Sequence, residues 1–226
     1  MADTPHSGGR LRFEAVVFDM DGVLVDSEPV HYESTVRLME GEFGLLFSEE
    51  ANAEFLGSTD RHMWEVLKER HDLPWAVDRL ITRRKEIYLD LLAAGLPWRD
   101  GILELIAGLS GSGYRLAVAS SALRRVIEYT LREGSLEERF EVVVSGEDVA
   151  RPKPYPDIYI EAARQLGLPP DTCVAIEDTE FGVRAAKSAG MHVIAFPCMT
   201  TRSSDFSAAD VRIDEASEIG RRLLGA

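Results

Sequence analysis

The feature that most constrains the fold is a series of short apolar runs along the chain. The first run, Ala15-Val16-Val17-Phe18, is too short for a helix and rich in β-branched residues, which is typical of a buried parallel strand. Helical patterns separate most of the later runs. This alternation predicts an α/β fold, a Rossmann-like open parallel sheet covered by helices on both faces. The later runs lie at 116–119, 142–144, 173–176, 193–196 and, more weakly, 211–213, and the helical patterns at 123–131, 158–166 and 182–189.

One long segment, residues 29–96, contains helix-like patterns but no convincing strand. Ser48 and Thr59 are both followed by acidic residues and mark helix starts. We therefore expect an α-helical cap domain inserted after the first strand, with Gly95-Leu96-Pro97 as the return hinge. The predicted organisation is a flexible tail at 1–12, a core domain of 13–28 and 97–226, and a cap domain of 29–96.

The charge and the cysteine content of the chain limit which binding partners and which cellular compartment we expect. The chain has 226 residues, with 25 basic and 39 acidic side chains and a net charge of −14. Because an acidic chain without a basic stripe repels phosphate backbones and anionic lipid, nucleic acid and membranes are excluded as main partners. Only two cysteines, Cys173 and Cys198, are present, so no disulfide framework forms and the cytoplasm is the predicted compartment. We expect a monomer or weak dimer.

Two carboxylates follow the first predicted strand at a spacing of two residues. Asp19 and Asp21 stand in Phe18-Asp19-Met20-Asp21-Gly22, and Gly22 allows the backbone to turn sharply there. Ligands of open parallel sheets bind at the carboxyl ends of the strands. Taken alone, this string is equally typical of a solvated acidic loop.

Polar residues also follow three later strands. Ser120-Ser121 come after the second strand, at a helix start suited to a phosphate oxygen. Lys153 comes after the third, in a loop that three prolines stiffen, and Glu177-Asp178 come after the fourth. The sequence therefore predicts that four carboxylates converge with a hydroxyl and an ammonium. Carboxylates this close raise one another's pKa, and a set of hard oxygen ligands without His or Cys favours Mg²⁺ over zinc.

These four motifs, D-x-D-G-V, the strand-two serine, K-P-x-P-D and E-D-x-x-x-G, resemble those of the haloacid dehalogenase-like superfamily. The resemblance covers residues 13–196. It is closest to the branch with a small helical cap after the first strand, which includes β-phosphoglucomutase and many sugar-phosphate phosphatases.

The resemblance implies a role for each matching position. Asp19 would be the nucleophile that forms an aspartyl-phosphate, and Asp21 the general acid and base. Ser120 and Lys153, with Ser121 beside them, would bind the phosphoryl group. Mg²⁺ would be held by Asp19, the Asp21 backbone carbonyl, Asp178, and Glu177 directly or through water.

The resemblance also implies substrate-binding residues in the cap. They are His31, Gly57, Arg61 and Arg84. The sequence departs from the mutase pattern, because Asp60 stands where the mutase has an arginine that binds the distal phosphate. Two simpler interpretations stay open: His31 as an ordinary residue of a helix start, and Arg83-Arg84-Lys85 as a solvated helix face.

The leading hypothesis is a Mg²⁺-dependent phosphatase acting through an aspartyl-phosphate on a small phosphorylated metabolite, in particular a sugar or polyol phosphate. The alternative is a phosphomutase of the β-phosphoglucomutase type, which uses the same intermediate. A third hypothesis, a catalytically silent binding module, is disfavoured by the presence of Asp19, Asp21, Lys153 and Asp178.

Overall fold

The chain folds into two compact units. The computed structural model describes residues 13–55 and 58–225. One unit comprises the chain up to Val25 together with Trp98 onward, and the other comprises Asp26–Pro97, where the sequence predicted an insert from 29 to 96. We call them the α/β unit and the helical unit. The predicted tail, residues 1–12, lies outside the described residues.

The α/β unit is built on a parallel sheet, as the sequence predicted. Over the described residues the sheet has six strands in the order β3-β2-β1-β4-β5-β6, and every neighbouring pair is parallel. All four residues of β1 are fully buried because strands flank it on both sides and helices cover the sheet. The strands are β1 (Ala15–Phe18), β2 (Arg115–Ser120), β3 (Val142–Ser145), β4 (Cys173–Glu177), β5 (His192–Ala195) and β6 (Val211–Arg212).

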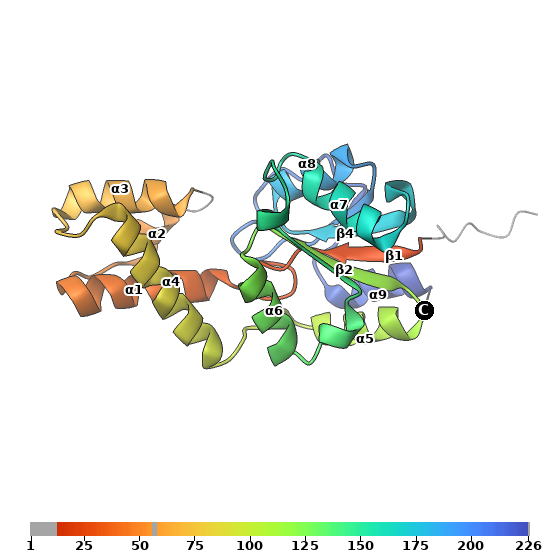
Figure 1. Cartoon of the computed structure of the whole chain (residues 1–226), viewed down its shortest axis with the longest axis horizontal. Helices are drawn as coiled ribbons and strands as arrows, with labels where there is room; N and C mark the ends of the chain where they lie inside the picture. The colour runs from red at the N-terminus through yellow and green to blue at the C-terminus, as the bar shows by residue number, and fades with distance from the viewer. Residues whose placement is uncertain (1–12, 56–57, 226) are drawn as a thin grey trace, which may run out of the picture. The chain divides into compact units, whose positions relative to one another are not determined.

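Helices cover both faces of this sheet (Figure 1). On one face, α7 (Asp157–Leu166) and α8 (Glu180–Ser188) contact each other and the strands. On the other, α5 (Ile102–Gly111) packs against α9 (Ala216–Leu224), and α6 (Arg124–Glu133) packs against β3 (Figure 1). Alanine and valine dominate the core beneath α7 and α8, so these helices approach the sheet closely. The sequence predicted α6, α7 and α8 but not α5 or α9.

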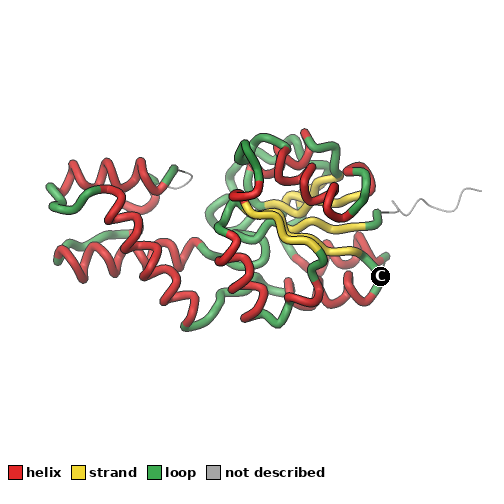
Figure 2. Tube along the Cα trace, viewed as in Figure 1, coloured by secondary structure: helices red, strands yellow, loops and turns green. Residues whose placement is uncertain are grey.

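The helical unit contains four helices among its described residues and no strand (Figure 2). Its core forms where α4 packs against α1 and α3, around Trp64. The predicted start signals are present, because Thr59 accepts a hydrogen bond from His62 N (3.2 Å) and Ser48 from Ala51 N (3.3 Å). The helices are α1 (Glu28–Phe43), α2 (Glu49–Ala53), α3 (Asp60–His71) and α4 (Val77–Ala93). None of the described helices of either unit is long and apolar enough to cross a membrane.

The outgoing and returning segments of chain that lead to the helical unit are hydrogen-bonded to each other. Arg99 N donates to Leu24 O (3.0 Å), and Asp26 N donates to Pro97 O (2.8 Å). Between these bonds, Val25 and Trp98 form an antiparallel bridge. The insertion therefore leaves and re-enters the α/β unit at one place.

Candidate active site

The sheet register brings the predicted residues to one edge. Phe18 of β1 is level with Ile176 of β4 and with Val118 of β2. Asp19 and Glu177 are therefore the next residues on neighbouring strands, and Ser120 ends the strand on the other side of β1. Since all three strands are parallel, their carboxyl ends present these side chains together.

Lys153 joins two of these carboxylates. Its Nζ donates to Asp19 Oδ1 (2.9 Å), Glu177 Oε1 (2.6 Å) and the Ala119 carbonyl (3.2 Å). The side chains of Lys153 and Asp19 are only 9% and 10% exposed, and that of Glu177 is fully buried. These are charge-assisted bonds in a site with little water, so they hold Asp19 in one orientation.

Asp19, Glu177 and Asp178 form a set that fits a divalent cation. One carboxylate oxygen from each lies within 4.8 Å of the others, and all three residues are buried. Asp178 Oδ1 has no hydrogen-bond partner among the described residues. Because an unsatisfied buried carboxylate oxygen is costly, this atom is suited to a cation as its partner. The hard oxygen donors are those that Mg²⁺ and Ca²⁺ take.

The protonation of these groups reflects an excess of buried negative charge. Burial, together with the charges of Glu177 and Asp21, raises the pKa of Asp19 to about 7, although Lys153 opposes the rise. Burial and the charges of Asp19 and Glu177 also raise the pKa of Asp178 well above its ordinary value. Burial lowers the pKa of Lys153. The charges and hydrogen bonds of Asp19 and Glu177 together have the larger effect, so the pKa lies above its ordinary value. One ammonium does not balance this many carboxylates.

The turn that carries Asp21 is held tightly against Asp178. Gly22 adopts φ of +76°, and a Cβ there would lie 2.0 Å from Asp178 Oδ2, so only glycine fits. Gly22 N donates to Val25 O (2.7 Å), and Arg99 Nη1 donates to Gly22 O (2.6 Å). Asp21 is half-buried in this turn.

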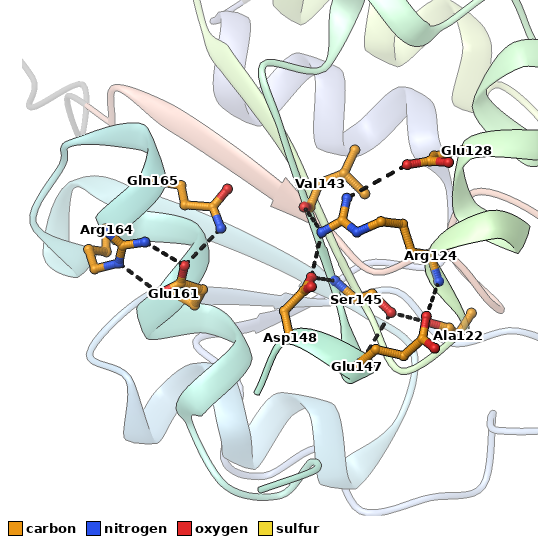
Figure 3. Close-up of polar contacts among 10 residues, drawn as sticks. All are labelled: Ala122, Arg124, Glu128, Val143, Ser145, Glu147, Asp148, Glu161, Arg164 and Gln165. Carbon is orange, nitrogen blue, oxygen red and sulfur yellow. Dashed lines mark hydrogen bonds and ion pairs between the residues drawn. The ribbon is translucent and has the colours of Figure 1, made fainter. Parts of the chain in front are cut away.

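The serine loop after β2 is fixed to the end of β3 (Figure 3). Ser120 is buried, and its Oγ accepts a hydrogen bond from Ala122 N (3.1 Å), whereas Ser121 is exposed. Ser145 Oγ donates to the Ala122 carbonyl (2.7 Å). Gly146 lies so close that a Cβ there would approach the Ser121 carbonyl to 2.9 Å. The loop therefore has a defined conformation next to the carboxylate cluster.

The sequence interpretation missed two residues that contact the cluster and a third that holds the neighbouring turn. Tyr159 on α7 donates its hydroxyl hydrogen to Glu177 Oε1 (2.5 Å). Cys198 Sγ donates to Asp178 Oδ2 (3.5 Å), and Arg99 binds the Gly22 turn as described. A signal existed for Tyr159, because a tyrosine on the buried side of a helix needs a hydrogen-bond partner. Cys198 follows β5 and so obeys the same strand-end rule as the other residues.

The predicted substrate-binding residues of the helical unit differ in burial and in their contacts. Arg84 is buried, contrary to the solvated-face interpretation, and its Nη2 bonds to His31 Nδ1 (2.5 Å). Both line one pocket of about 150 Å³. Arg61 is exposed and bonds to Asp78 (2.5 Å). Gly57 lies outside the described residues.

Comparisons with known proteins agree with this geometry. The family model described as haloacid dehalogenase-like hydrolase matches residues 16–196. The chain is 33% identical to the protein CbbY of Rhodobacter capsulatus, over 95% of this chain and 98% of the relative. It is 33% identical to a phosphorylated carbohydrates phosphatase of Thermotoga maritima, over 80% and 83% of the two chains.

A solved structure is similar throughout. It is a mutant of CbbY from Rhodobacter sphaeroides in complex with xylulose-1,5-bisphosphate, with a TM-score of 0.78, 32% identity, and coverage of 92% of this chain and 96% of that one. The match therefore extends across both units of the chain. The protein belongs to the haloacid dehalogenase-like hydrolase family, as a phosphoric monoester hydrolase within it.

Proposed function

We propose that the protein is a Mg²⁺-dependent phosphatase that hydrolyses a small phosphorylated sugar or polyol through an aspartyl-phosphate on Asp19. The observation that carries the proposal is the buried Asp19 carboxylate, held at 2.9 Å by Lys153 within a cluster of further carboxylates. A carboxylate in this setting is positioned as a nucleophile, and the ammonium beside it offsets the charge of an incoming phosphate.

The first step transfers the phosphoryl group to the enzyme. An Asp19 carboxylate oxygen attacks phosphorus, and the bond from phosphorus to the substrate oxygen breaks. Asp21, two residues along the same turn, gives its proton to the leaving alkoxide. Lys153 and the Ser120–Ser121 loop bind the oxygens of the transferring group, where negative charge develops.

The second step returns Asp19 to its starting state. Asp21, now ionised, removes a proton from water as the water attacks the phosphorus of the aspartyl-phosphate. The bond between Asp19 and phosphorus breaks, releasing inorganic phosphate and the free carboxylate. The general acid of the first step is thus the general base of the second.

A cation completes the charge balance. Asp19, Glu177 and Asp178, with the backbone carbonyl of Asp21, would hold Mg²⁺. Its positive charge would favour the ionised form of Asp19 and reduce the repulsion between carboxylate and phosphate. Asp178 Oδ1, which has no hydrogen-bond partner among residues 13–55 and 58–225, supports this assignment over a role for Lys153 alone.

The similarity to a phosphorylated carbohydrates phosphatase supports the sugar or polyol part of the proposal. The non-reacting end of such a substrate would be bound by the helical unit, where Arg84 and His31 line the pocket and where Arg61 and Gly57 stay predicted contacts. The cytoplasmic location and the monomeric or weakly dimeric state also stay predictions.

The test is phosphate release from a panel of sugar and polyol monophosphates, with Mg²⁺ and with excess EDTA. We expect turnover that EDTA abolishes and Mg²⁺ restores. If no monophosphate is hydrolysed, or if EDTA has no effect, the proposal fails. Including β-glucose 1-phosphate and detecting glucose 6-phosphate distinguishes the mutase alternative, which predicts isomer formation in place of phosphate release.

A further inference from the structure

The end of β3 lies directly beside the serine loop that begins at Ser120. The sheet register pairs Ser120, the last residue of β2, with Ser145, the last residue of β3. Partners on one level of a parallel sheet direct their side chains to the same face, and both serines are buried. The two backbones also meet after the strands, since a Cβ on Gly146 would approach the Ser121 carbonyl to 2.9 Å. Ser145 is therefore placed to contact the serine loop from the neighbouring strand.

One residue of this loop, Ala122, connects the two serine hydroxyls. Ser145 Oγ donates to the Ala122 carbonyl (2.7 Å), and Ala122 N donates to Ser120 Oγ (3.1 Å). A serine hydroxyl has one hydrogen to donate and two lone pairs that accept. Because Ser120 Oγ accepts in its bond with Ala122, it can still donate its hydrogen to an oxygen of a phosphoryl group. The position of the Ser120 hydroxyl thus depends on Ala122, which is bonded to Ser145.

Ser145 is itself held in place by its neighbours (Figure 3). Its N donates to Asp148 Oδ2 (2.7 Å), and its Oγ accepts from Glu147 N (3.2 Å). Asp148 pairs with Arg124 Nη2 (2.5 Å), and Arg124 N donates to Glu147 Oε2 (2.8 Å). Arg124 is the first residue of α6, the helix that follows the serine loop. The segment after β3 and the start of α6 therefore hold each other, and Ser145 extends this network to the loop.

The end of β2 also locates Lys153. The carbonyl of Ala119, the residue before Ser120, accepts a hydrogen bond from Lys153 Nζ (3.2 Å), which in turn donates to Asp19 Oδ1. A shift of the backbone after Ala119 would move the Ser120 hydroxyl relative to the ammonium and to Asp19. The bond from Ser145 to Ala122 opposes such a shift.

We propose that Ser145 is a positioning residue for phosphoryl binding, which holds Ala122 so that the Ser120 hydroxyl can donate to an oxygen of the transferring group. The inference rests on the proposed function, because that function assigns Ser120 to the phosphoryl group. Ser145 acts only through the serine loop. Without its hydroxyl the Ala122 carbonyl loses this donor, and a displacement of about 1 Å in a binding group can cost on the order of 10²-fold in rate.

Replacing Ser145 by alanine tests the proposal with three measurements. For the monophosphate that the enzyme hydrolyses fastest, kcat/KM should fall at least about tenfold, the scale of one hydrogen bond to a charged group. Calorimetric titration with inorganic phosphate, at saturating Mg²⁺, should show binding that is weaker by at least about fivefold. Titration with Mg²⁺ alone should give an affinity within about twofold of wild type, because Ser145 bonds to neither Asp19 nor Asp178. A general loosening of the fold would weaken both ligands.

A double-mutant cycle shows whether Ser145 acts through Ser120. If it does, adding Ser145→Ala to Ser120→Ala should lower kcat/KM by no more than about a further twofold, since the group that it positions is already absent. Two effects that multiply in full would show that the residues act independently. Should Ser145→Ala fold poorly, Ser145→Cys repeats the cycle, because it fills a similar space and is only a weak donor.

Tyr114→Phe is the matched control. It removes a hydroxyl of the same unit that also donates to a backbone carbonyl, Leu223 O, at 2.8 Å. Tyr114 precedes β2 and so lies at the opposite end of the strand from Ser120. We expect kcat/KM and the phosphate affinity to stay within about twofold of wild type.

Three results overturn the inference: an unchanged phosphate affinity in Ser145→Ala, a Mg²⁺ affinity that falls as much as the phosphate affinity, or full additivity in the cycle. Each of them leaves a working phosphatase and hence the proposed function intact. A wild-type protein that hydrolyses no monophosphate contradicts the proposed function itself, which separates the two failures.

Discussion

The two candidate binding regions differ in how their buried charges are balanced. In the α/β unit, three buried carboxylates lie together, the Lys153 ammonium bonds to two of them, and Asp178 Oδ1 has no partner in the described part of the chain. In the helical unit, the buried guanidinium of Arg84 has a partner at each nitrogen. Excess buried negative charge is relieved when a cation binds, whereas a buried arginine that is paired with an acid carries no such excess. The proposed function places the chemistry in the first region and the recognition of the substrate's non-reacting end in the second.

Replacing the proposed nucleophile should have the largest effect and tests the carboxylate cluster of the α/β unit. Asp19→Asn should lower kcat at least about 10⁴-fold, because the amide forms no acyl phosphate. Steady-state phosphate release from the best monophosphate measures the change. Asp205→Asn, which alters an exposed acid of the same unit, should leave kcat unchanged. Activity of the Asp19 variant within about 100-fold of wild type would exclude the covalent route.

The metal requirement tests the same region. Asp178→Asn removes a carboxylate of the predicted cation set and should raise the Mg²⁺ concentration for half-maximal activity by at least about 10–100-fold, the cost of losing even an outer partner. Calorimetric titration with Mg²⁺ should show the same weakening without any substrate. Asp214→Asn, an exposed acid paired with Arg212, serves as the control. Equal Mg²⁺ affinity in the two variants would remove Asp178 from the ligand set.

Replacing each of two adjacent arginines on α4 tests whether the pocket of the helical unit binds substrate. Arg84→Gln should raise KM about tenfold and change kcat by less than about threefold, because the residue would bind substrate away from the reacting atoms. Arg83→Gln, which breaks only exposed pairs with Glu42 and Glu86, should change neither constant appreciably. A large fall in kcat with KM unchanged would contradict the division between the two regions.

The pH dependence of stability should reveal the excess charge around Asp19. Its folded pKa, about 7, exceeds the ordinary value of 3.8, so between these values the folded state holds a proton that the unfolded state has lost. Stability from this group is therefore present at low pH and is lost as pH rises toward 7. Without divalent cations, the unfolding free energy of wild type should fall relative to Asp19→Asn by about 1 kcal/mol between pH 5 and pH 6. Denaturant unfolding of both proteins at the two pH values measures it, and a constant difference would contradict the raised pKa.

The α/β fold was predictable because its strands are continuous apolar runs. Each of the six predicted runs became a strand, and the strand-end rule pointed to Asp19, Lys153 and Glu177 before any contact was known. Helix α5 was missed because it carries Gly108, Ser110 and Gly111, which are poor helix formers, and its stability comes from packing against α9. That contact joins segments far apart in the sequence.

The burial of Arg84 was not predicted because it stands in a run of three cations, Arg83-Arg84-Lys85. Such a run is typical of a solvated helix face. A signal was present: Arg84 lies four residues after Leu80 and four before Tyr88, on the buried face of α4. Its pairing with Asp60 depends on how α3 and α4 pack, which hydrophobic periodicity does not specify. The sequence alone showed only that an acid replaces the expected arginine at position 60.

The hydrogen-bonded junction at Leu24–Asp26 and Pro97–Arg99 has a practical consequence for engineering. The segment that leads into the helical unit and the segment that leads out of it are already joined by backbone hydrogen bonds. Residues 26–97 are therefore an insertion whose two ends lie next to each other. A helical insert from another member of the family could be exchanged at these points without rebuilding the sheet or the catalytic loops. Under the proposed function, chimaeras made in this way would change the substrate preference and keep the residues proposed to transfer the phosphoryl group.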